Sequence, residues 1–309
     1  MAYHEQQYRR RISLAQANNA LILLIAINII IFIILAFLKA VFHLQHKSNE
    51  EALHFFNNNV LNQFSLPAQV GKIASKPWTI FTHMFTHDSF WHLLGNMLWL
   101  WVFGYIFLDL TGNRKITPLY IYGALAGALA FILSYNFFPA LQQYLPEATA
   151  LGASAGVMAI AVGVTMISPG YRIFPMILGG IPIWVLTMIY LLIDLVSIPK
   201  SNPGGHIAHL AGALTGVLFI YTFRRGYDWS EWMNNFFDWV TNLFNPDKPK
   251  KGKNIRQELF YKSTTRPYKK TPNITEQRVN EILDKINQKG FNSLTEEEKD
   301  LLKRASQEK

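Results

Sequence analysis

The sequence predicts an all-α membrane protein with six transmembrane helices and both termini in the cytoplasm. Half of its 309 residues are hydrophobic and only 16% are charged. The hydrophobic residues lie in runs of about 20, the length that crosses the hydrocarbon core of a bilayer as a helix. Lys and Arg gather in the short loops of one side, which marks that side as cytoplasmic. The chain has no cysteine, which excludes disulfides, thiolate metal sites and a cysteine nucleophile.

The first expected element is a basic N-terminal segment, residues 1–18, which should lie in the cytoplasm. The first span follows Arg9, Arg10 and Arg11, as the apolar part of a signal peptide would. Its apolar run exceeds the roughly 7–15 residues of a signal peptide, and no clear small-x-small cleavage site follows it. We therefore expect a retained span. The six expected spans are 19–42, 89–108, 116–138, 150–168, 180–198 and 206–223.

The loops between the spans set the orientation, because cationic short loops tend to stay in the cytoplasm. The long loop at 43–88 then lies outside, and an amphipathic piece at 53–61 is expected to fold there. Spans two, four and six all run from outside to inside, so their first residues lie at a similar depth. The basic residues that define the inner side are Arg9 to Arg11, Arg114, Lys115, Arg172, Arg224 and Arg225.

Four polar residues lie near the starts of these three parallel spans. His92 and Asn96 are four residues apart on one face of span two, Ser154 begins span four, and His209 begins span six. Taken singly, each has an ordinary structural interpretation: a packing face of small residues for Ser154, a hydrogen-bonded helix contact for His209, an interhelical hydrogen bond for Asn96, and a bystander position for His92. Together at one depth, they predict a serine nucleophile with a histidine base. His92 and Asn96 would then donate hydrogen bonds to a developing oxyanion.

Other polar residues near the spans are expected to have different places. His206 lies three residues before His209 and competes with it for the role of base. No His-Glu-x-x-His motif or carboxylate pair accompanies the histidines, so we expect no metal and no cofactor. Asp194 and Trp184, both on the fifth span, are expected to belong to a substrate gate.

These residues together resemble the rhomboid family of intramembrane serine proteases. The match runs in order over about residues 20–223. Three parts carry it: Pro77 to His87 followed by His92-Leu93-Leu94-Gly95-Asn96-Met97, then Gly152-Ala153-Ser154, then Ala208-His209-Leu210-Ala211-Gly212 with Gly216.

The resemblance implies a six-span rhomboid-like bundle and a catalytic dyad of Ser154 and His209, without an orienting aspartate. It also implies an oxyanion hole formed by the Ser154 N–H with the His92 and Asn96 side chains, and single-span membrane proteins as substrates. Two positions depart from the family pattern. Ala155 stands where a glycine usually follows the serine, and Met158 where some members pack an aromatic ring against the base.

Residues 224–309 form a polar, charged tail expected in the cytoplasm. Thr295 and Glu298 have the spacing of a capping box at the start of its last helix. We expect the hairpin at 275–307 to dock a cytosolic partner. The expected pieces are an interfacial amphipathic helix at 227–244, a basic flexible linker at 245–272, and a helical hairpin of 275–289 and 295–307.

The patterns predict one function and leave two alternatives. We expect residues 19–223 to be an intramembrane serine endopeptidase in the cell (inner) membrane, with lipids and single-span proteins as partners. The net charge of +9 flanks apolar runs instead of forming an aromatic-rich basic groove, so no nucleic-acid partner is expected. One alternative is a catalytically silent relative that binds membrane helices, although such a protein usually lacks the serine or the histidine. The other is a transporter, which the apolar inner halves of spans four and six disfavour.

Overall fold

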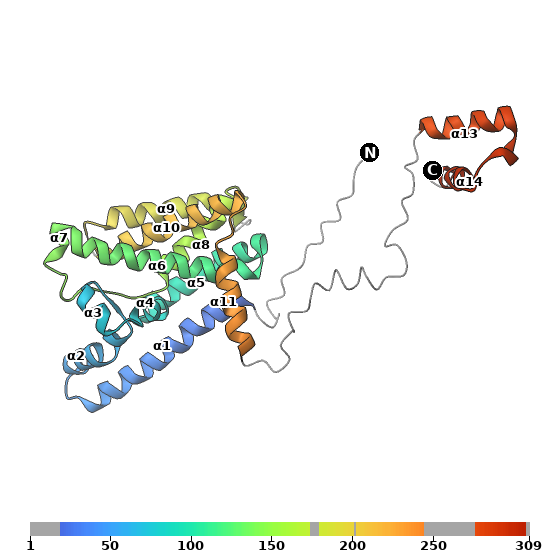
Figure 1. Cartoon of the computed structure of the whole chain (residues 1–309). Helices are drawn as coiled ribbons and strands as arrows, with labels where there is room; N and C mark the ends of the chain where they lie inside the picture. Colours follow the sequence, from blue (N-terminus) through green and yellow to red (C-terminus); the bar gives the residue numbers. More distant parts are fainter. Residues whose placement is uncertain (1–18, 174–178, 201, 244–275, 307–309) are drawn as a thin grey trace. The chain divides into compact units, whose positions relative to one another are not determined.

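The computed structural model describes residues 19–173, 179–200, 202–243 and 276–306 (Figure 1). The chain separates into two compact units, Met1–Phe244 and Asn245–Lys309. The first unit is a helical bundle with two short antiparallel sheets. Its elements are α1 (Ala20–Gln45), α2 (Asn49–Asn59), η1 (Leu61–Gln63), β1 (Leu66–Pro67), α3 (Val70–Ser75), α4 (Thr79–Thr82), η2 (His83–Phe85), α5 (Phe90–Thr111), α6 (Asn113–Phe137), α7 (Pro139–Gln142), β2 (Thr149–Ala150), α8 (Ser154–Ile167), β3 (Arg172–Ile173), β4 (Ile181–Pro182), α9 (Ile183–Ser197), α10 (Pro203–Arg224) and α11 (Ser230–Leu243).

Six apolar helices coincide with the six expected spans. Among the described residues, α1, α5, α6 and α10 are long and apolar enough to cross a membrane. The helices α8 and α9 are apolar but shorter, with 14 and 15 residues. The protein is therefore a mostly helical, multi-pass membrane protein, while the exact number of spans and the side of each terminus stay predictions.

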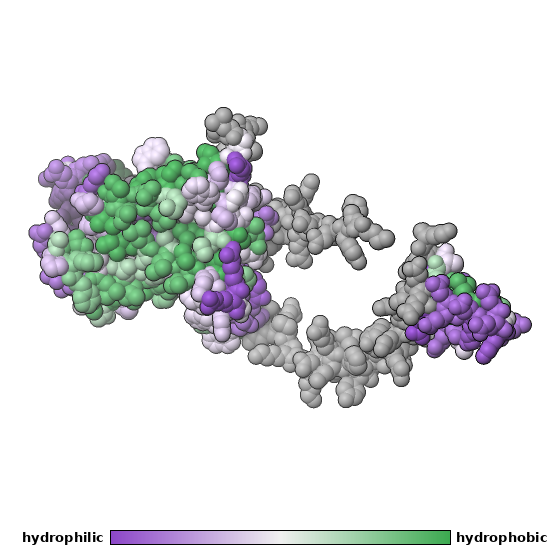
Figure 2. All heavy atoms as spheres, turned by 90° about the horizontal axis from the view of Figure 1, so that it is seen from above, coloured by the Kyte–Doolittle hydropathy of each residue, from purple (hydrophilic) through white to green (hydrophobic). Residues whose placement is uncertain are grey.

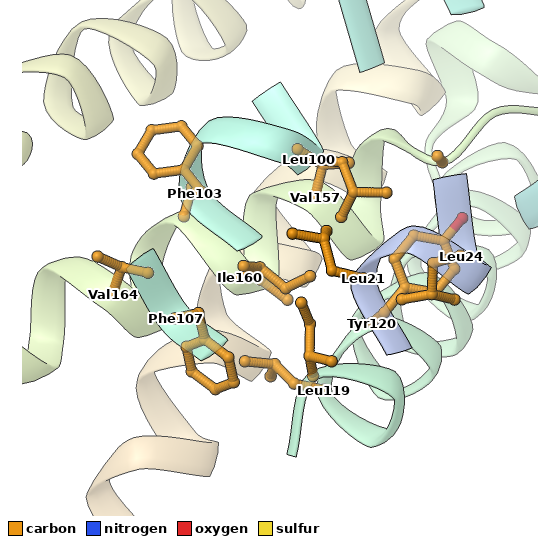
Figure 3. Packing of buried hydrophobic residues seen from close by; sticks show 14 of the residues in the cluster. Leu21, Leu24, Leu100, Phe103, Phe107, Leu119, Tyr120, Val157, Ile160 and Val164 are labelled. Carbon is orange, nitrogen blue, oxygen red and sulfur yellow. The ribbon is translucent and has the colours of Figure 1, made fainter. Parts of the chain in front are cut away.

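Helix α8 is the central element of this bundle. It contacts α5, α6, α9 and α10, and every residue from Ala155 to Val164 is buried. Its first residue, Ser154, is partly buried at the end of this enclosed helix. Figure 3 shows part of the packing on one side, where α8 meets side chains of α1, α5 and α6: Leu21, Leu24, Leu100, Phe103, Phe107, Leu119, Tyr120, Val157, Ile160 and Val164.

Glycines allow α6 and α10 to approach α8 closely. A β-carbon on Gly212 would lie 2.2 Å from the Ala155 carbonyl oxygen, and one on Gly216 would lie 2.4 Å from the Ala159 carbonyl oxygen. On α6, a β-carbon on Gly123 would lie 2.4 Å from the β-carbon of Ala159. Lipid offers little hydrophobic drive for helix pairing, so such close backbone packing is what holds membrane helices together.

The periphery of the bundle is apolar. Figure 2 shows hydrophobic residues over most of the bundle's visible face and hydrophilic residues gathered toward its ends. Ile30 and Ile33 of α1 are 55% and 59% exposed, and Ile193 of α9 is 57% exposed. A contiguous apolar surface of this kind would be a liability in water. It suits a surface that faces lipid chains.

The segment expected to lie outside folds against the bundle. Helix α2 buries Ala52 and Phe56, and the Phe56 ring lies 6.1 Å from that of Phe42 on α1. Strand β1 pairs with β2, the strand that precedes α8. This segment, residues 43–88 and called the outer segment below, thereby supports the chain just before Ser154.

Helix α11 falls within the range expected for the interfacial helix. Trp232 and Trp239 are 61% and 60% exposed, as an amphipathic helix would have them, although its location at the interface stays a prediction. The expected N-terminal segment 1–18 and the linker 245–272 lie outside the described residues. Helix α11 and the two residues before it are attached to α6 by ion pairs of Arg114 with Asp238 and of Lys115 with Asp228, and by the Tyr122 O–H donating to the Trp229 carbonyl oxygen at 2.8 Å.

The second unit comprises α13 (Glu276–Lys289), η3 (Phe291–Ser293) and α14 (Glu296–Ala305). The expected capping box of Thr295 and Glu298 is confirmed, with both of its hydrogen bonds present. The small core of this unit is built around Ile282, Leu294 and Leu301.

Candidate active site

Ser154 is the first residue of α8, and the backbone before it is held in a specific shape. Gly152 has φ +115°, a conformation that side chains disfavour. Its N–H donates to the His83 carbonyl oxygen at 2.9 Å, and the Ala153 N–H donates to His87 Nε2 at 3.4 Å. The segment between β1 and α5 therefore fixes the turn that presents the serine hydroxyl.

His209 lies in the second turn of α10 and reaches across to this hydroxyl. Its Nε2 is 2.6 Å from Ser154 Oγ. The separation depends on the close contact of α8 with α10 at Gly212, one turn beyond His209 in the chain. The structure thus brings together the two residues predicted as nucleophile and base.

Asp194 of α9 lies behind His209. Its Oδ1 is 2.8 Å from His209 Nδ1 and 2.7 Å from His206 Nδ1, and the Asp194 side chain is only 3% exposed. The expectation that Asp194 belongs to a substrate gate is therefore wrong, because the carboxylate is buried between two imidazoles. The family resemblance implied that no aspartate orients His209. That expectation is also wrong for this chain, because Asp194 contacts the ring.

Trp184 was expected at the gate as well, and the structure places it elsewhere. It lies in the first turn of α9, ten residues before Asp194 and therefore about 15 Å away along the helix axis. Its side chain is 47% exposed at the periphery of the bundle. It is not among the residues that line the cavity above Ser154, so a gate at this cavity does not include it.

His92 and Asn96 share one face of α5, as expected, but their surroundings differ. His92 is partly exposed, and its Nδ1 lies 2.9 Å from Asp88 Oδ1. Asn96 is buried, and its Nδ2 donates to the His92 carbonyl oxygen at 3.0 Å. His92 lines the cavity above Ser154, whereas Asn96 lies one turn deeper and is not part of the lining.

A cavity of about 1280 Å³ opens above these residues. Its lining includes Ser154, His209, His92 and Gly152, together with residues of the outer segment. It therefore joins the predicted nucleophile, the predicted base and one predicted oxyanion donor in a single space, large enough to admit a stretch of extended peptide.

His83, which lines part of this cavity, and His87 are almost fully buried. Burial lowers the pKa of each from 6.5 to about 4, because the charged imidazolium loses its hydration. Both imidazoles are therefore neutral at pH 7. The backbone carbonyl of His83 and the ring of His87 accept the hydrogen bonds from the turn before Ser154.

Sequence reasoning did not find two of the contacts in this site. The pairing of Asp88 with His92 has a local signal, since residues four apart on a helical turn face each other. The contact of Asp194 with His209 has none, because it depends on how α9 and α10 pack.

Among the described residues, Asp194, His206 and His209 are the cluster whose ligand atoms lie close enough, within 4.8 Å of one another, to hold a metal ion. The present contacts account for these atoms without one. Both Nδ1 atoms lie at hydrogen-bond distance from Asp194 Oδ1, and the Nε2 of His209 is directed at Ser154. We therefore interpret the three side chains as a hydrogen-bonded network, in which Asp194 fixes the protons of the two imidazoles.

Comparison with known proteins identifies relatives of this chain. Residues 74–226 match the family described as Rhomboid domain, and residues 266–308 match DUF6576, a family of unknown function. "Rhomboid protein 1, mitochondrial" of Saccharomyces cerevisiae is 30% identical over 147 residues, which cover 44% of this chain and 38% of that protein. "Presenilin-associated rhomboid-like protein, mitochondrial" of Rattus norvegicus is 27% identical over 155 residues, 48% of this chain and 38% of the relative.

A plant relative gives a similar result. "RHOMBOID-like protein 12, mitochondrial" of Arabidopsis thaliana is 26% identical over 157 residues, covering 48% of this chain and 47% of the relative. The chain thus spans less than half the length of each of these curated relatives. The matched rhomboid domain contains Ser154, His209, His92 and Asn96, and with this match the chain belongs to the rhomboid family.

Proposed function

We propose that this protein is an intramembrane serine endopeptidase in which Ser154 is the nucleophile and His209 the general base. The single observation that carries the proposal is the 2.6 Å contact between His209 Nε2 and Ser154 Oγ. A serine hydroxyl is a weak nucleophile at neutral pH unless a base within hydrogen-bond reach takes its proton. This pair has that geometry, inside a bundle of apolar helices.

Asp194 extends the pair to a triad. As a carboxylate it accepts the Nδ1–H of His209, so the lone pair of the neutral imidazole lies on Nε2, where it faces the serine. When Nε2 takes the serine proton, the imidazolium forms beside a negative charge. The same Oδ1 accepts from His206, which assigns His206 to the support of Asp194 rather than to the base.

The oxyanion that forms on the attacked carbonyl needs donors on the opposite side of Ser154. We assign this role to the Ser154 N–H at the start of α8 and to the side chains of His92 and Asn96. An asparagine amide has two N–H donors, so the bond from Asn96 to the His92 carbonyl leaves one available. The N-terminal end of α8 also favours negative charge.

The substrate class follows from the position of the cavity. The nucleophile lies at the start of an apolar helix and beneath a folded outer segment, so we propose membrane proteins with a single span, cut where their helix unwinds near the outer surface. Membrane lipids surround the enzyme, and the proposed location is the cell (inner) membrane. The hairpin at 275–307 is proposed to dock a cytosolic partner.

The test is cleavage of a single-span substrate by the purified protein in lipid vesicles. Replacing Ser154 or His209 with alanine should abolish cleavage while expression and the thermal midpoint remain. Two matched controls should retain activity: Ser168→Ala at the other end of α8, and His43→Ala at an exposed position of α1 that does not line the cavity. Cleavage by both Ser154→Ala and His209→Ala would disprove the assignment.

A fluorophosphonate probe separates an active protease from a catalytically silent relative. Such a probe forms a bond only with an activated serine. Labelling of the wild type and not of Ser154→Ala supports the protease, and the absence of labelling in both would favour the silent alternative.

A further inference from the structure

Tyr120 of α6 is fully buried, and its hydroxyl reaches the segment that precedes α5. The phenol O–H donates a hydrogen bond to the Met84 carbonyl oxygen of η2 at 2.6 Å. The ring of Phe85, the next residue of η2, has its centroid 5.8 Å from that of Tyr120. Figure 3 shows Tyr120 among buried side chains of α1 and α8. Because a buried hydroxyl needs a hydrogen-bond partner, the bond to Met84 fixes η2 against α6.

The same tyrosine packs directly against α8, two residues after Ser154. A β-carbon on Gly156 would lie 2.7 Å from Cδ2 of the Tyr120 ring and 2.7 Å from the Tyr120 carbonyl oxygen. Only a residue without a side chain allows this approach of the two helices. Tyr120 therefore contacts α8 with its ring and η2 with its hydroxyl, and it sets the separation between these two elements.

The position of η2 matters because η2 holds the turn that leads into α8. Two consecutive carbonyls of η2 have different partners. The His83 carbonyl oxygen accepts the Gly152 N–H at 2.9 Å, and the Met84 carbonyl oxygen accepts the Tyr120 hydroxyl. A single turn of 3₁₀-helix has little stability of its own, so outside contacts decide where it lies. A shift of the Met84 carbonyl would therefore also move the acceptor of Gly152.

We propose that Tyr120 is a positioning residue for the nucleophile. Its hydroxyl holds Met84, so that the adjacent His83 carbonyl fixes Gly152 and the turn aligns Ser154 with His209. The inference rests on the proposed function of this site. Tyr120 takes no part in the proton transfer, and its contribution is geometric. A displacement of the reacting atoms by about 1 Å is enough to cost a large part of the rate.

Tyr122, on the same helix, offers a matched control for a purely structural role. Its hydroxyl donates to the Trp229 carbonyl oxygen at 2.8 Å. Tyr122→Phe and Tyr120→Phe thus each remove one bond from a phenol to a backbone carbonyl, a bond that attaches a neighbouring segment to α6. The segment held by Tyr122 leads into α11, whereas the one held by Tyr120 contacts the turn before Ser154. A merely structural hydroxyl at Tyr120 would make the two variants behave alike.

The experiment uses full-length protein in lipid vesicles and measures kcat and KM for cleavage of a single-span substrate. It also measures the rate of labelling by a fluorophosphonate probe, which reports the alignment of Ser154 without a peptide substrate. Tyr120→Phe removes the hydroxyl and keeps the ring against Gly156. Its kcat and labelling rate should both fall about tenfold, with KM little changed. Tyr122→Phe should keep wild-type kcat and labelling, even where its thermal midpoint falls as far.

Two further variants test the route from Tyr120 to the nucleophile. In a Gly152→Ala background the turn is already displaced, so Tyr120→Phe should lower kcat by a smaller factor than it does in wild type. Tyr122→Phe should have the same effect in both backgrounds. Phe85→Leu keeps the Tyr120 hydroxyl but removes the ring contact between η2 and α6. It should lower the labelling rate in the same direction, and it decides the question if Tyr120→Phe does not fold.

Equal kcat values of Tyr120→Phe and Tyr122→Phe would overturn the inference, as would a wild-type labelling rate in Phe85→Leu. Amide hydrogen exchange over residues 149–156 reports the turn even in an inactive protein. Exchange there should be faster in Tyr120→Phe than in wild type or Tyr122→Phe, because the bond from Gly152 to His83 weakens. Unchanged exchange would contradict the inference. Cleavage by Ser154→Ala, or a wild type that the probe does not label, would instead disprove the proposed function, so the two failures are distinguishable.

Discussion

At the scale of single residues, Gly152 shows how tightly the turn before the nucleophile is constrained. Replacement by alanine meets two obstacles, since the φ of +115° disfavours a side chain and the new β-carbon would lie 2.8 Å from His92 Nε2. We expect Gly152→Ala to lower kcat at least about tenfold by displacing His92 or Ser154. Cleavage assays with Gly170→Ala as the control check this, because a β-carbon there meets nothing within 4 Å.

A second prediction at this scale concerns Asp194. Asp194→Asn keeps the size of the side chain but can present an amide N–H to His209, which favours the wrong tautomer of the base. We expect kcat to fall by two or more orders of magnitude, roughly as in other serine triads, with KM little changed. A kcat within a few-fold of wild type would show that His209 works without Asp194.

The buried histidines predict how stability depends on pH. In the unfolded chain each imidazole titrates near pH 6.5, whereas His83 and His87 in the folded protein have a pKa of about 4. The unfolded state therefore binds more protons below pH 6.5, and stability should fall as the pH is lowered toward 4. Thermal midpoints in detergent from pH 7 to pH 4.5 measure the decline. His87→Gln should flatten the decline, and His54→Gln, at an exposed position, should leave it unchanged.

At the scale of elements, the contact of α10 with α8 holds His209, the proposed base, against Ser154, the proposed nucleophile. Alanine is the better helix former, so helix propensity alone favours Gly212→Ala by about 1 kcal/mol. The structure predicts the opposite, because the added carbon would lie 2.2 Å from the Ala155 carbonyl oxygen. We expect a loss of about 1–3 kcal/mol from overpacking, together with loss of cleavage as His209 is pushed away from Ser154.

The matched control for this prediction is Gly95→Ala on α5, where a β-carbon meets nothing within 4 Å. It should be neutral or stabilising by about 0.5–1 kcal/mol, because alanine restricts the unfolded chain. Thermal midpoints and kcat of the two variants give the comparison. Equal behaviour of Gly212→Ala and Gly95→Ala would show that the α8–α10 contact tolerates expansion.

At the scale of the whole molecule, the two compact units have separate cores. The second unit is built on its own cluster around Ile282, Leu294 and Leu301. Removing residues 245–309 should therefore leave the thermal midpoint and kcat of the first unit unchanged. Ending the chain at residue 226 also removes α11, which leaves Lys115 and Tyr122 without the partners Asp228 and Trp229. We expect that shorter chain to be less stable, and differential scanning fluorimetry of both truncations tests it.

The sequence alone determined the class of this protein and pointed to Ser154 and His209 as its candidate nucleophile and base. Runs of apolar residues and the placement of basic loops are local features, so they predict membrane helices before any packing is known. Ser154 and His209 followed because polar groups inside apolar helices have few structural reasons to be there. The structure places their side chains 2.6 Å apart.

The tertiary structure decided which carboxylates act on the two histidines. Asp194 lies behind His209 and not at a gate, Trp184 lies at the far end of α9, and Asp88 contacts His92. The rotation and tilt of one membrane helix against another depend on small-residue contacts between them. An apolar span shows no hydrophobic periodicity that reveals which of its faces turns inward. Neighbours across helices therefore emerge only when the helices are packed.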